Sequence, residues 1–345
     1  MNDYKEMPVL FGPDDSLIGL IATPAQKSMA PVGCLLLNVG ANHRVGPRRI
    51  NVKLARQLAG MGVSSIRIDL AGLGDSRPAS GDEHFRKREV LDLQAAMNLM
   101  QTLLGIERFV LVGLCSGAGS GLALCVSDPR MIGLLMFDGY AFPSRRARWD
   151  RSLQSFLAER SVTALLGRVY SNMQRAWPPA LYAASKSRTG AAGAAAAGGP
   201  ASIFAADDRG AVADLFCRCM AQIAERDVAV MFVYSATLQA RDWNRDQLGP
   251  FVNEPFIRRA EYRFLPEVDH SLLSLKAQKI FMSVVCDWAM RVIQGSGHAL
   301  PPSGGRLSGF GGGGDSKRHL DDREIILKHT RPVRVARIVQ QLVQL

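Results

Sequence analysis

The stretch that most constrains this chain is residues 109–120, which read FVLVGLCSGAGS. The first four residues are apolar and typical of a buried strand, and a Gly-x-Cys-x-Gly turn follows at Gly113, Cys115 and Gly117. The apolar run at residues 122–126 indicates a helix after the turn. This order is that of a nucleophile elbow, with cysteine where serine is more common. We therefore predict that Cys115 sits in strained backbone at a helix N-terminus, where partial positive charge favours a thiolate.

Apolar strands alternate with amphipathic helices along the chain, and this alternation predicts an α/β fold with a doubly wound, mostly parallel sheet. Residues 8–24 instead alternate apolar and polar side chains around a Gly-Pro-Asp-Asp turn, which is typical of an antiparallel edge hairpin. The predicted parallel strands are residues 33–38, 63–70, 109–112, 131–137, 228–235 and 262–265, and the predicted helices are 51–61, 86–104 and 277–293.

The regular alternation stops at Pro143, and the chain divides there. We predict that residues 1–142 and 227–294 form the two parts of one core. Residues 143–226, which contain an Ala/Gly-rich run at 183–201, are expected to form an inserted helical cap with a low-complexity loop. Residues 295–345 begin with a segment rich in Gly, Pro and Ser and are expected to form a disordered linker and tail.

Composition narrows the class of protein further. The chain has 345 residues and a net charge of +11, but its arginines are not interleaved with aromatic residues, so we expect no nucleic-acid partner. No run is apolar enough to span a membrane or to act as a signal peptide, and we expect a cytoplasmic protein. The six cysteines show no metal-ligand spacing, so we expect neither a metal nor another cofactor.

Several motifs in a fixed order indicate which kind of α/β fold this is. RVGPRR is followed by LARQLA, IRIDLAGLGDS, VGLCSGAGS and, late in the chain, DHS. In this respect the chain resembles the exosortase-system-associated hydrolases, bacterial proteins of the serine-aminopeptidase-like branch of the α/β-hydrolase fold. The resemblance covers roughly residues 30–140 and 228–293, and it implies a reaction class rather than a substrate.

The resemblance also implies a histidine base after the last strand. His270, in PEVDHSLLS, follows the last predicted strand and precedes the last predicted helix, the position of the triad histidine in this fold.

The chain departs from the family's pattern at the acid. The resembling proteins carry it just after the penultimate strand, but here that strand ends in SATL, and none of these side chains carries a charge. Asp138, at the end of the preceding strand, and Asp242, in QARDWN, are the two replacements, and we favour Asp138. A thiol needs less help to ionise than a hydroxyl, so a Cys–His pair can also work with a weak orienting acid.

The oxyanion hole follows from the same geometry. One donor is expected to be the backbone N–H of Ser116, and the other that of Gly40 or Ala41 in the loop after the first central strand. His43 and Arg44 in that loop are candidates for shaping the site. The turn at residues 69–76 is expected to hold the loop in place and to take no part in chemistry.

Cysteine at the elbow makes thioester chemistry favourable, because exchange between thioesters is nearly isoenergetic. Dienelactone hydrolases and polyhydroxyalkanoate synthases also carry cysteine there, so it does not decide the reaction. The leading hypothesis is an esterase or thioesterase acting on a small acyl substrate. The alternatives are a cysteine acyltransferase that moves acyl or aminoacyl groups between the thiols of coenzyme A or an acyl carrier protein, and an inactive scaffold kept for binding.

Overall fold

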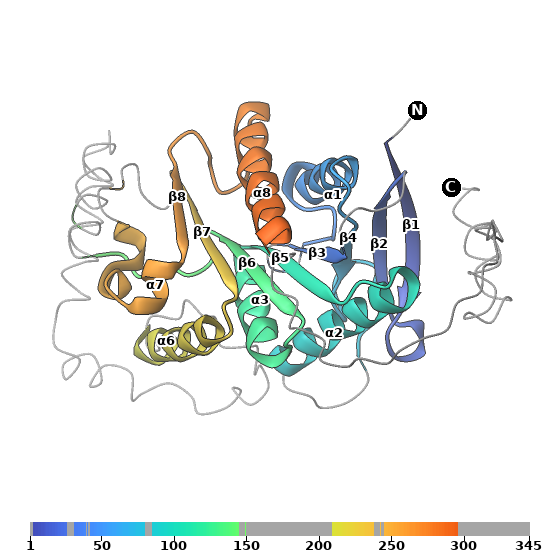
Figure 1. Ribbon diagram of the computed structural model, residues 1–345, viewed down its shortest axis with the longest axis horizontal. Coiled ribbons are helices and arrows are strands. Elements are labelled where there is room, and N and C mark those ends of the chain that lie inside the picture. Colours follow the sequence, from blue (N-terminus) through green and yellow to red (C-terminus); the bar gives the residue numbers. More distant parts are fainter. Residues whose placement is uncertain are drawn as a thin grey trace, which may run out of the picture. The chain divides into compact units, whose positions relative to one another are not determined.

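A computed structural model gives the fold. It describes residues 3–25, 31–38, 40, 42–79, 85–144, 149, 209–237, 242 and 245–295. Within these residues one eight-stranded sheet runs through the molecule in the order β1-β2-β4-β3-β5-β6-β7-β8 (Figure 1). The mostly parallel sheet predicted from the sequence is confirmed.

The first two strands form the predicted antiparallel hairpin. β1 (Tyr4–Phe11) pairs with β2 (Leu17–Pro24) across the short 3₁₀ turn η1 (Pro13–Asp15), and β2 pairs antiparallel with β4 (Ser65–Asp69). Alternating burial along β2 matches its alternating side chains. The hairpin therefore extends one edge of the sheet, as its sequence pattern predicts.

The remaining strands run parallel. They are β4, β3 (Val32–Leu37), β5 (Arg108–Leu114), β6 (Met131–Phe137), β7 (Ala229–Ser235) and β8 (Glu261–Leu265). β3 is buried throughout and β5 in all but its first residue, which is why their sequences show continuous rather than alternating apolar runs. Parallel pairing places the carboxyl ends of these strands along one edge of the sheet.

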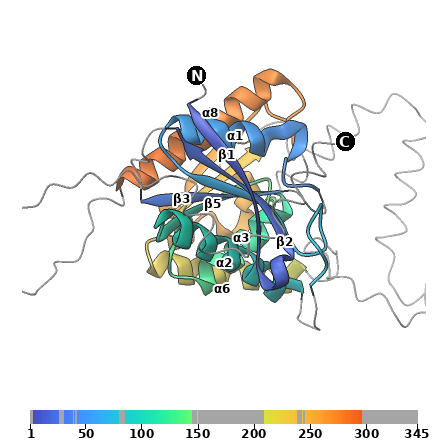
Figure 2. The same ribbon diagram turned by 90° about the vertical axis from the view of Figure 1, so that its right-hand side faces the viewer.

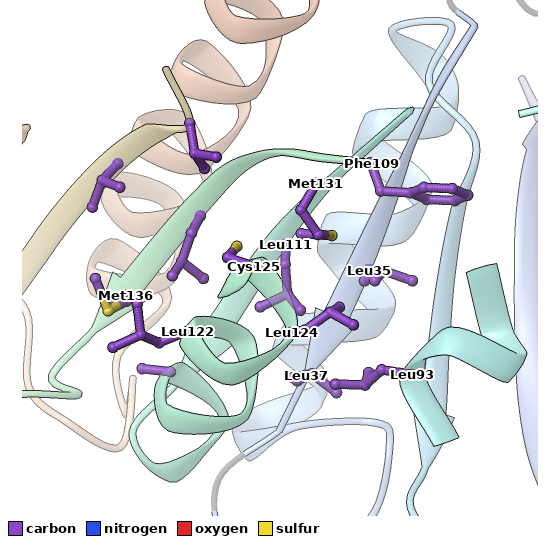
Figure 3. Close-up of a cluster of buried hydrophobic side chains, with 14 of the residues drawn as sticks. Leu35, Leu37, Leu93, Phe109, Leu111, Leu122, Leu124, Cys125, Met131 and Met136 are labelled. Carbon is purple, nitrogen blue, oxygen red and sulfur yellow. The ribbon is translucent and has the colours of Figure 1, made fainter. Parts of the chain in front are cut away.

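Helices cover both faces of the sheet (Figures 1 and 2). On one face, α1 (Ile50–Gly60) and α8 (Leu275–Gly295) share a buried apolar cluster with the sheet. On the other face lie α2 (Phe85–Leu104), α3 (Ser116–Ser127) and α6 (Arg209–Glu225). Figure 3 shows part of this second cluster, where Leu122 and Leu124 of α3 lie over Leu111 of β5. The short helix α7 (Pro255–Arg259) and the 3₁₀ segments η2 (Pro47–Arg49) and η5 (Asp246–Phe251) lie in connections.

The last part of the predicted cap is α6, and this helix packs against the core that covers the sheet. α6 packs beside α3 and places Phe216, Met220 and Ile223 in the core, so it is a covering helix. An inserted cap can therefore lie only in the part of 143–226 before α6. Most of that part, with the Ala/Gly run at 183–201, is outside the described residues, and so is the predicted tail from residue 296 onward.

Within the described part of the chain, no helix has the length and apolar character needed to cross a bilayer.

Trp288 of α8 is fully buried and packs on Gly133 of β6, which leaves room for its ring. Replacement by alanine removes this contact and leaves a cavity, so Trp288→Ala is expected to lower the free energy of unfolding by about 3–5 kcal/mol. Urea denaturation followed by circular dichroism measures the change. Trp149 is 78% exposed, and Trp149→Ala is the matched control, expected to change stability by less than about 0.5 kcal/mol. Equal losses in the two variants would contradict the packing described here.

Candidate active site

Cys115 lies at the junction of β5 and α3, in backbone that side chains rarely adopt. Its φ is 51° and its ψ is −111°, outside the regions open to ordinary residues. The conformation is held on both sides, since Cys115 N–H donates to the Phe137 carbonyl at 2.7 Å and Ala118 N–H donates to the Cys115 carbonyl at 3.1 Å. The thiol is partly exposed, and the strain marks the position as a functional candidate.

The two glycines of the motif are required by close backbone approach. A Cβ on Gly113 would lie 2.6 Å from the Gly117 carbonyl oxygen, and a Cβ on Gly117 would lie 2.7 Å from the Asn38 carbonyl oxygen. Strand β5, the first turn of α3 and the end of β3 can therefore meet only where no side chain intervenes.

His270 comes from the other end of the chain, in the loop between β8 and α8. Its backbone N–H donates to Thr237 Oγ1 at 2.8 Å, and its ring lies parallel to that of Phe137, with centroids 6.2 Å apart. About a third of its side chain is exposed. The ring is therefore fixed at the site and still reachable from solvent.

Asp138 is the acid that reaches this histidine. It follows β6 directly, with a positive φ of 48°, and its carboxylate is fully buried. Asp138 Oδ2 accepts a hydrogen bond from His270 Nδ1 at 2.9 Å. The structure thus brings together Cys115, Asp138 and His270 from three different connections of the sheet.

Asp242, the other candidate acid, is engaged elsewhere. Its Oδ1 accepts a hydrogen bond from the Asp246 N–H at 2.8 Å, at the start of η5. Burial, and then the neighbouring Asp242 carboxylate, raise the pKa of Tyr262 well above its ordinary value. Asp242 therefore belongs to the packing of this connection beside β8.

The charge state of His270 follows from its neighbours. Its pKa is raised to about 10, first by the hydrogen bond to Asp138 and then by the hydrogen bond to the Cys115 side chain, while burial acts in the opposite direction. The ring is therefore an imidazolium at neutral pH, flanked by a carboxylate on one side and by the sulfur on the other.

Two of the predicted oxyanion residues, Gly40 and Ser116, contact each other, and Ser116 directly follows Cys115 in the sequence. Ser116 opens α3, so its backbone N–H is one of the unpaired donors of a helix N-terminus. Gly40, with a positive φ of 52°, donates its N–H to Ser116 Oγ at 2.5 Å. The loop after β3 thus contacts the start of α3, whereas Ala41 lies outside the described residues.

His43 and Arg44 brace the loop that carries Gly40. The buried Asp69 carboxylate accepts hydrogen bonds from both the backbone and the guanidinium of Arg44, and Arg44 also bonds Asp75 at 2.7 Å. His43 Nε2 lies 2.9 Å from Asp75, and hydrogen bonds from Arg44 and then His43 hold the pKa of Asp75 below its ordinary value. The guanidinium already bonds both carboxylates, so the cluster is best explained as a structural tie between two loops.

These observations together decide the fold. The strand order has its antiparallel strand β2 beside β4, the elbow follows β5, and a histidine follows the last strand. The fold is that of an α/β hydrolase.

Comparison of the sequence with protein-family models gives no match, and comparison with curated proteins gives none either.

Among solved structures, similar ones are other α/β-hydrolase folds. A proline iminopeptidase from Mycobacterium smegmatis is 17% identical, with 85% of this chain and 100% of that chain covered and a TM-score of 0.48. An α/β serine hydrolase without a lid from Xanthomonas campestris is 11% identical, with 87% and 98% covered and a TM-score of 0.46. A dienelactone hydrolase from Anabaena variabilis is 10% identical, with 84% and 98% covered and a TM-score of 0.47. The activities of these proteins are not carried over to this chain.

Sequence reasoning missed two residues that touch the site of this α/β-hydrolase fold. Ser235 donates its hydroxyl to Asp138, and Thr237 accepts the His270 N–H. Both lie in the SATL turn, which was considered only for its lack of an acid. The pattern of two hydroxyl residues at the end of a strand was the available indication.

The hydrogen bond to Asp138 is the first cause of the raised His270 pKa. Asp138→Asn is therefore expected to lower the pKa from about 10 toward the ordinary 6.5. The imidazolium would persist through neutral pH in the unmodified protein and would lose its proton at a lower pH in the variant, where only the Cys115 side chain still raises the pKa. NMR titration of ¹⁵N-labelled histidines measures this, with His270→Gln identifying the resonance.

Asp242→Asn is the matched control for this titration, because it neutralises the other candidate acid. It is expected to leave the His270 titration unchanged. A large shift in the Asp242 variant and none in the Asp138 variant would reverse the assignment of the acid.

Proposed function

We propose that this protein is an acyl-handling hydrolase that cleaves an ester or thioester through an acyl intermediate on Cys115. The observation that supports the proposal is the hydrogen bond of the His270 ring to the buried Asp138 carboxylate at 2.9 Å, in an imidazole whose pKa the nearby Cys115 side chain also raises. A nucleophile, a base and a group that orients the base are the parts that covalent acyl transfer requires.

The proposed reaction has two halves. In the first, the Cys115 sulfur attacks the acyl carbon and forms an S–C bond, and the bond from that carbon to the leaving oxygen or sulfur breaks. The proton held between the sulfur and the imidazole goes to the leaving group. In the second half, a water molecule loses a proton to the imidazole and attacks the thioester carbon to form a C–O bond. The C–S bond then breaks, the carboxylic acid leaves, and the proton on the imidazole is shared again with the Cys115 sulfur.

The backbone N–H groups of Ser116 and Gly40 are the proposed donors to the oxyanion that forms in each half. The N-terminus of α3 adds partial positive charge at the same place. Gly40 N–H bonds Ser116 Oγ in this structure, so the hydroxyl marks the place of an acceptor that an oxyanion would take over.

Two finer parts of the proposal rest on the sequence. The resemblance to exosortase-system-associated hydrolases depends on the motifs described above. A cytoplasmic location suits the six cysteines, which are all free thiols.

The inactive-scaffold hypothesis started from the absence of an acid in the SATL turn. The hydrogen bond between His270 and Asp138 supports the active-enzyme proposal instead, with the acid supplied by the neighbouring strand.

The proposal is tested with short-chain acyl thioesters and p-nitrophenyl esters. Cys115→Ala is expected to lower the rate by about a thousandfold or more, because it removes the sulfur that forms the proposed covalent intermediate. Cys219→Ala, which removes a partly exposed thiol on α6, is the matched control and is expected to keep full activity. Equal rates in the unmodified protein and in Cys115→Ala would end the catalytic proposal.

The acyl-enzyme is expected as a mass increase of one acyl group, mapped to the peptide that contains Cys115. When the trapped intermediate is offered water alone, or water with an added thiol such as coenzyme A, the product distinguishes hydrolysis from transfer. Release of free acid at the same rate in both supports a hydrolase. Preferential formation of the new thioester would replace hydrolysis by the acyltransferase alternative.

A further inference from the structure

We propose that Ser235 and Thr237, at the end of β7 and in the turn that follows, are positioning residues. They hold Asp138 and His270, the proposed acid and base, in the relative position that their hydrogen bond requires. The inference rests on the proposed function, since it concerns the same site. It assigns a role to two residues in the turn where the exosortase-system-associated hydrolases, which this chain resembles, carry their acid.

Ser235 binds both oxygens of the Asp138 carboxylate. Its backbone N–H donates to Oδ1 at 2.8 Å and its hydroxyl donates to Oδ2 at 2.6 Å. The Thr237 N–H in turn donates to Ser235 Oγ at 3.3 Å, so the hydroxyl accepts from one neighbour and its single proton is directed at the carboxylate. With both oxygens bound, the carboxylate cannot rotate away from the imidazole.

Burial makes the hydrogen bond from the Ser235 hydroxyl to Asp138 important. Ser235 is fully buried, and the Asp138 side chain is shielded from solvent as well. A carboxylate in such a place needs donors from the protein, because no water supplies them. Its three donors are Ser235 N–H, Ser235 O–H and His270 Nδ1–H. Removal of the hydroxyl leaves Oδ2 with the imidazole alone and Oδ1 with the backbone N–H of residue 235, so the carboxylate is held by two donors instead of three and less firmly.

Thr237 acts on the base. Its Oγ1 accepts the His270 backbone N–H at 2.8 Å, and the neighbouring Ala236 N–H donates to the Val268 carbonyl at 2.9 Å. The loop that carries His270 is thus tied to the end of β7 at two points. The same three-residue turn therefore fixes the acid with its first residue and the base with its last.

The main test compares Ser235→Ala with a matched control. Ser65 is also a fully buried serine, in β4 of the same sheet, but among the described residues its hydroxyl has no hydrogen-bond partner. Ser65→Ala is therefore expected to keep kcat and KM. Ser235→Ala is expected to lower kcat about 10-fold to 100-fold with KM nearly unchanged, as for loss of a hydrogen bond to a charged group.

Two further variants separate the hydrogen bond from packing. Ser235→Cys keeps nearly the same volume but is a weak donor, so it is expected to lose kcat as Ser235→Ala does; it also serves if the alanine variant does not fold. Thr237→Val removes the acceptor at constant shape and is expected to lower kcat about 10-fold. Thr237→Ser restores the hydroxyl and is expected to restore the rate.

A spectroscopic measurement tests the same proposal without substrate. The His270 Nδ1–H proton, bonded to Asp138, is expected as a downfield imidazole resonance in the unmodified protein. It is expected to broaden or move upfield in Ser235→Ala and to stay in place in Ser65→Ala. A role confined to stability would shift the melting temperature and leave this resonance unchanged.

The outcomes separate this inference from the proposed function. Loss of activity in Cys115→Ala, together with unaltered kcat and an unaltered resonance in the Ser235 and Thr237 variants, would overturn the positioning role alone. An unaltered rate in Cys115→Ala, with the resonance still displaced in Ser235→Ala, would end the catalytic proposal. The inference that Ser235 positions Asp138 against His270 would stand.

Discussion

The site depends on one buried negative charge. The Asp138 carboxylate is fully shielded from solvent at the end of β6, where an unpaired charge would cost several kcal/mol. Two donors from Ser235 and one from His270 make the charge tolerable, and the charge in turn holds the imidazole as a cation beside the sulfur. The contacts that stabilise the buried carboxylate are therefore the same ones that set the charge of the imidazole.

Parallel strand pairing makes this arrangement possible. Cys115, Asp138 and Ser235 follow or end β5, β6 and β7, which are neighbours in the sheet, and His270 follows β8 next to them. Residues more than 150 positions apart in sequence thus meet at one edge of the sheet. Asp138 can reach His270 from the end of β6 because β6 lies between β5, which leads to Cys115, and β7, which ends in Ser235.

The elbow sets a second constraint, which is steric. Gly113 and Gly117 lie where any Cβ would meet backbone oxygen, so β3, β5 and α3 can approach closely only with glycine at both positions. The Arg44–Asp69 contacts then fix the loop after β3 against the loop after β4. As a result, the Gly40 N–H comes to lie beside the N-terminus of α3.

Much of the fold could be predicted from local patterns. The hairpin, each parallel strand and the helices α1, α2 and α8 were predicted within a few residues, because apolar runs and helical spacing reflect burial on one or two faces. Helix α6 was assigned to a cap, because its amphipathic pattern does not say which surface it covers. The short elements η5 and α7 were missed, since each is too brief to show a period.

The sequence by itself determined the strained turn at Cys115, since Gly-x-Cys-x-Gly between a buried strand and a helix allows little else. It also placed His270 after the last strand. Only the tertiary structure decided between Asp138 and Asp242, and only it revealed Ser235 and Thr237. The physical reason is that these contacts join side chains from separate connections, and their distances depend on how the strands are ordered and paired rather than on any spacing along the chain.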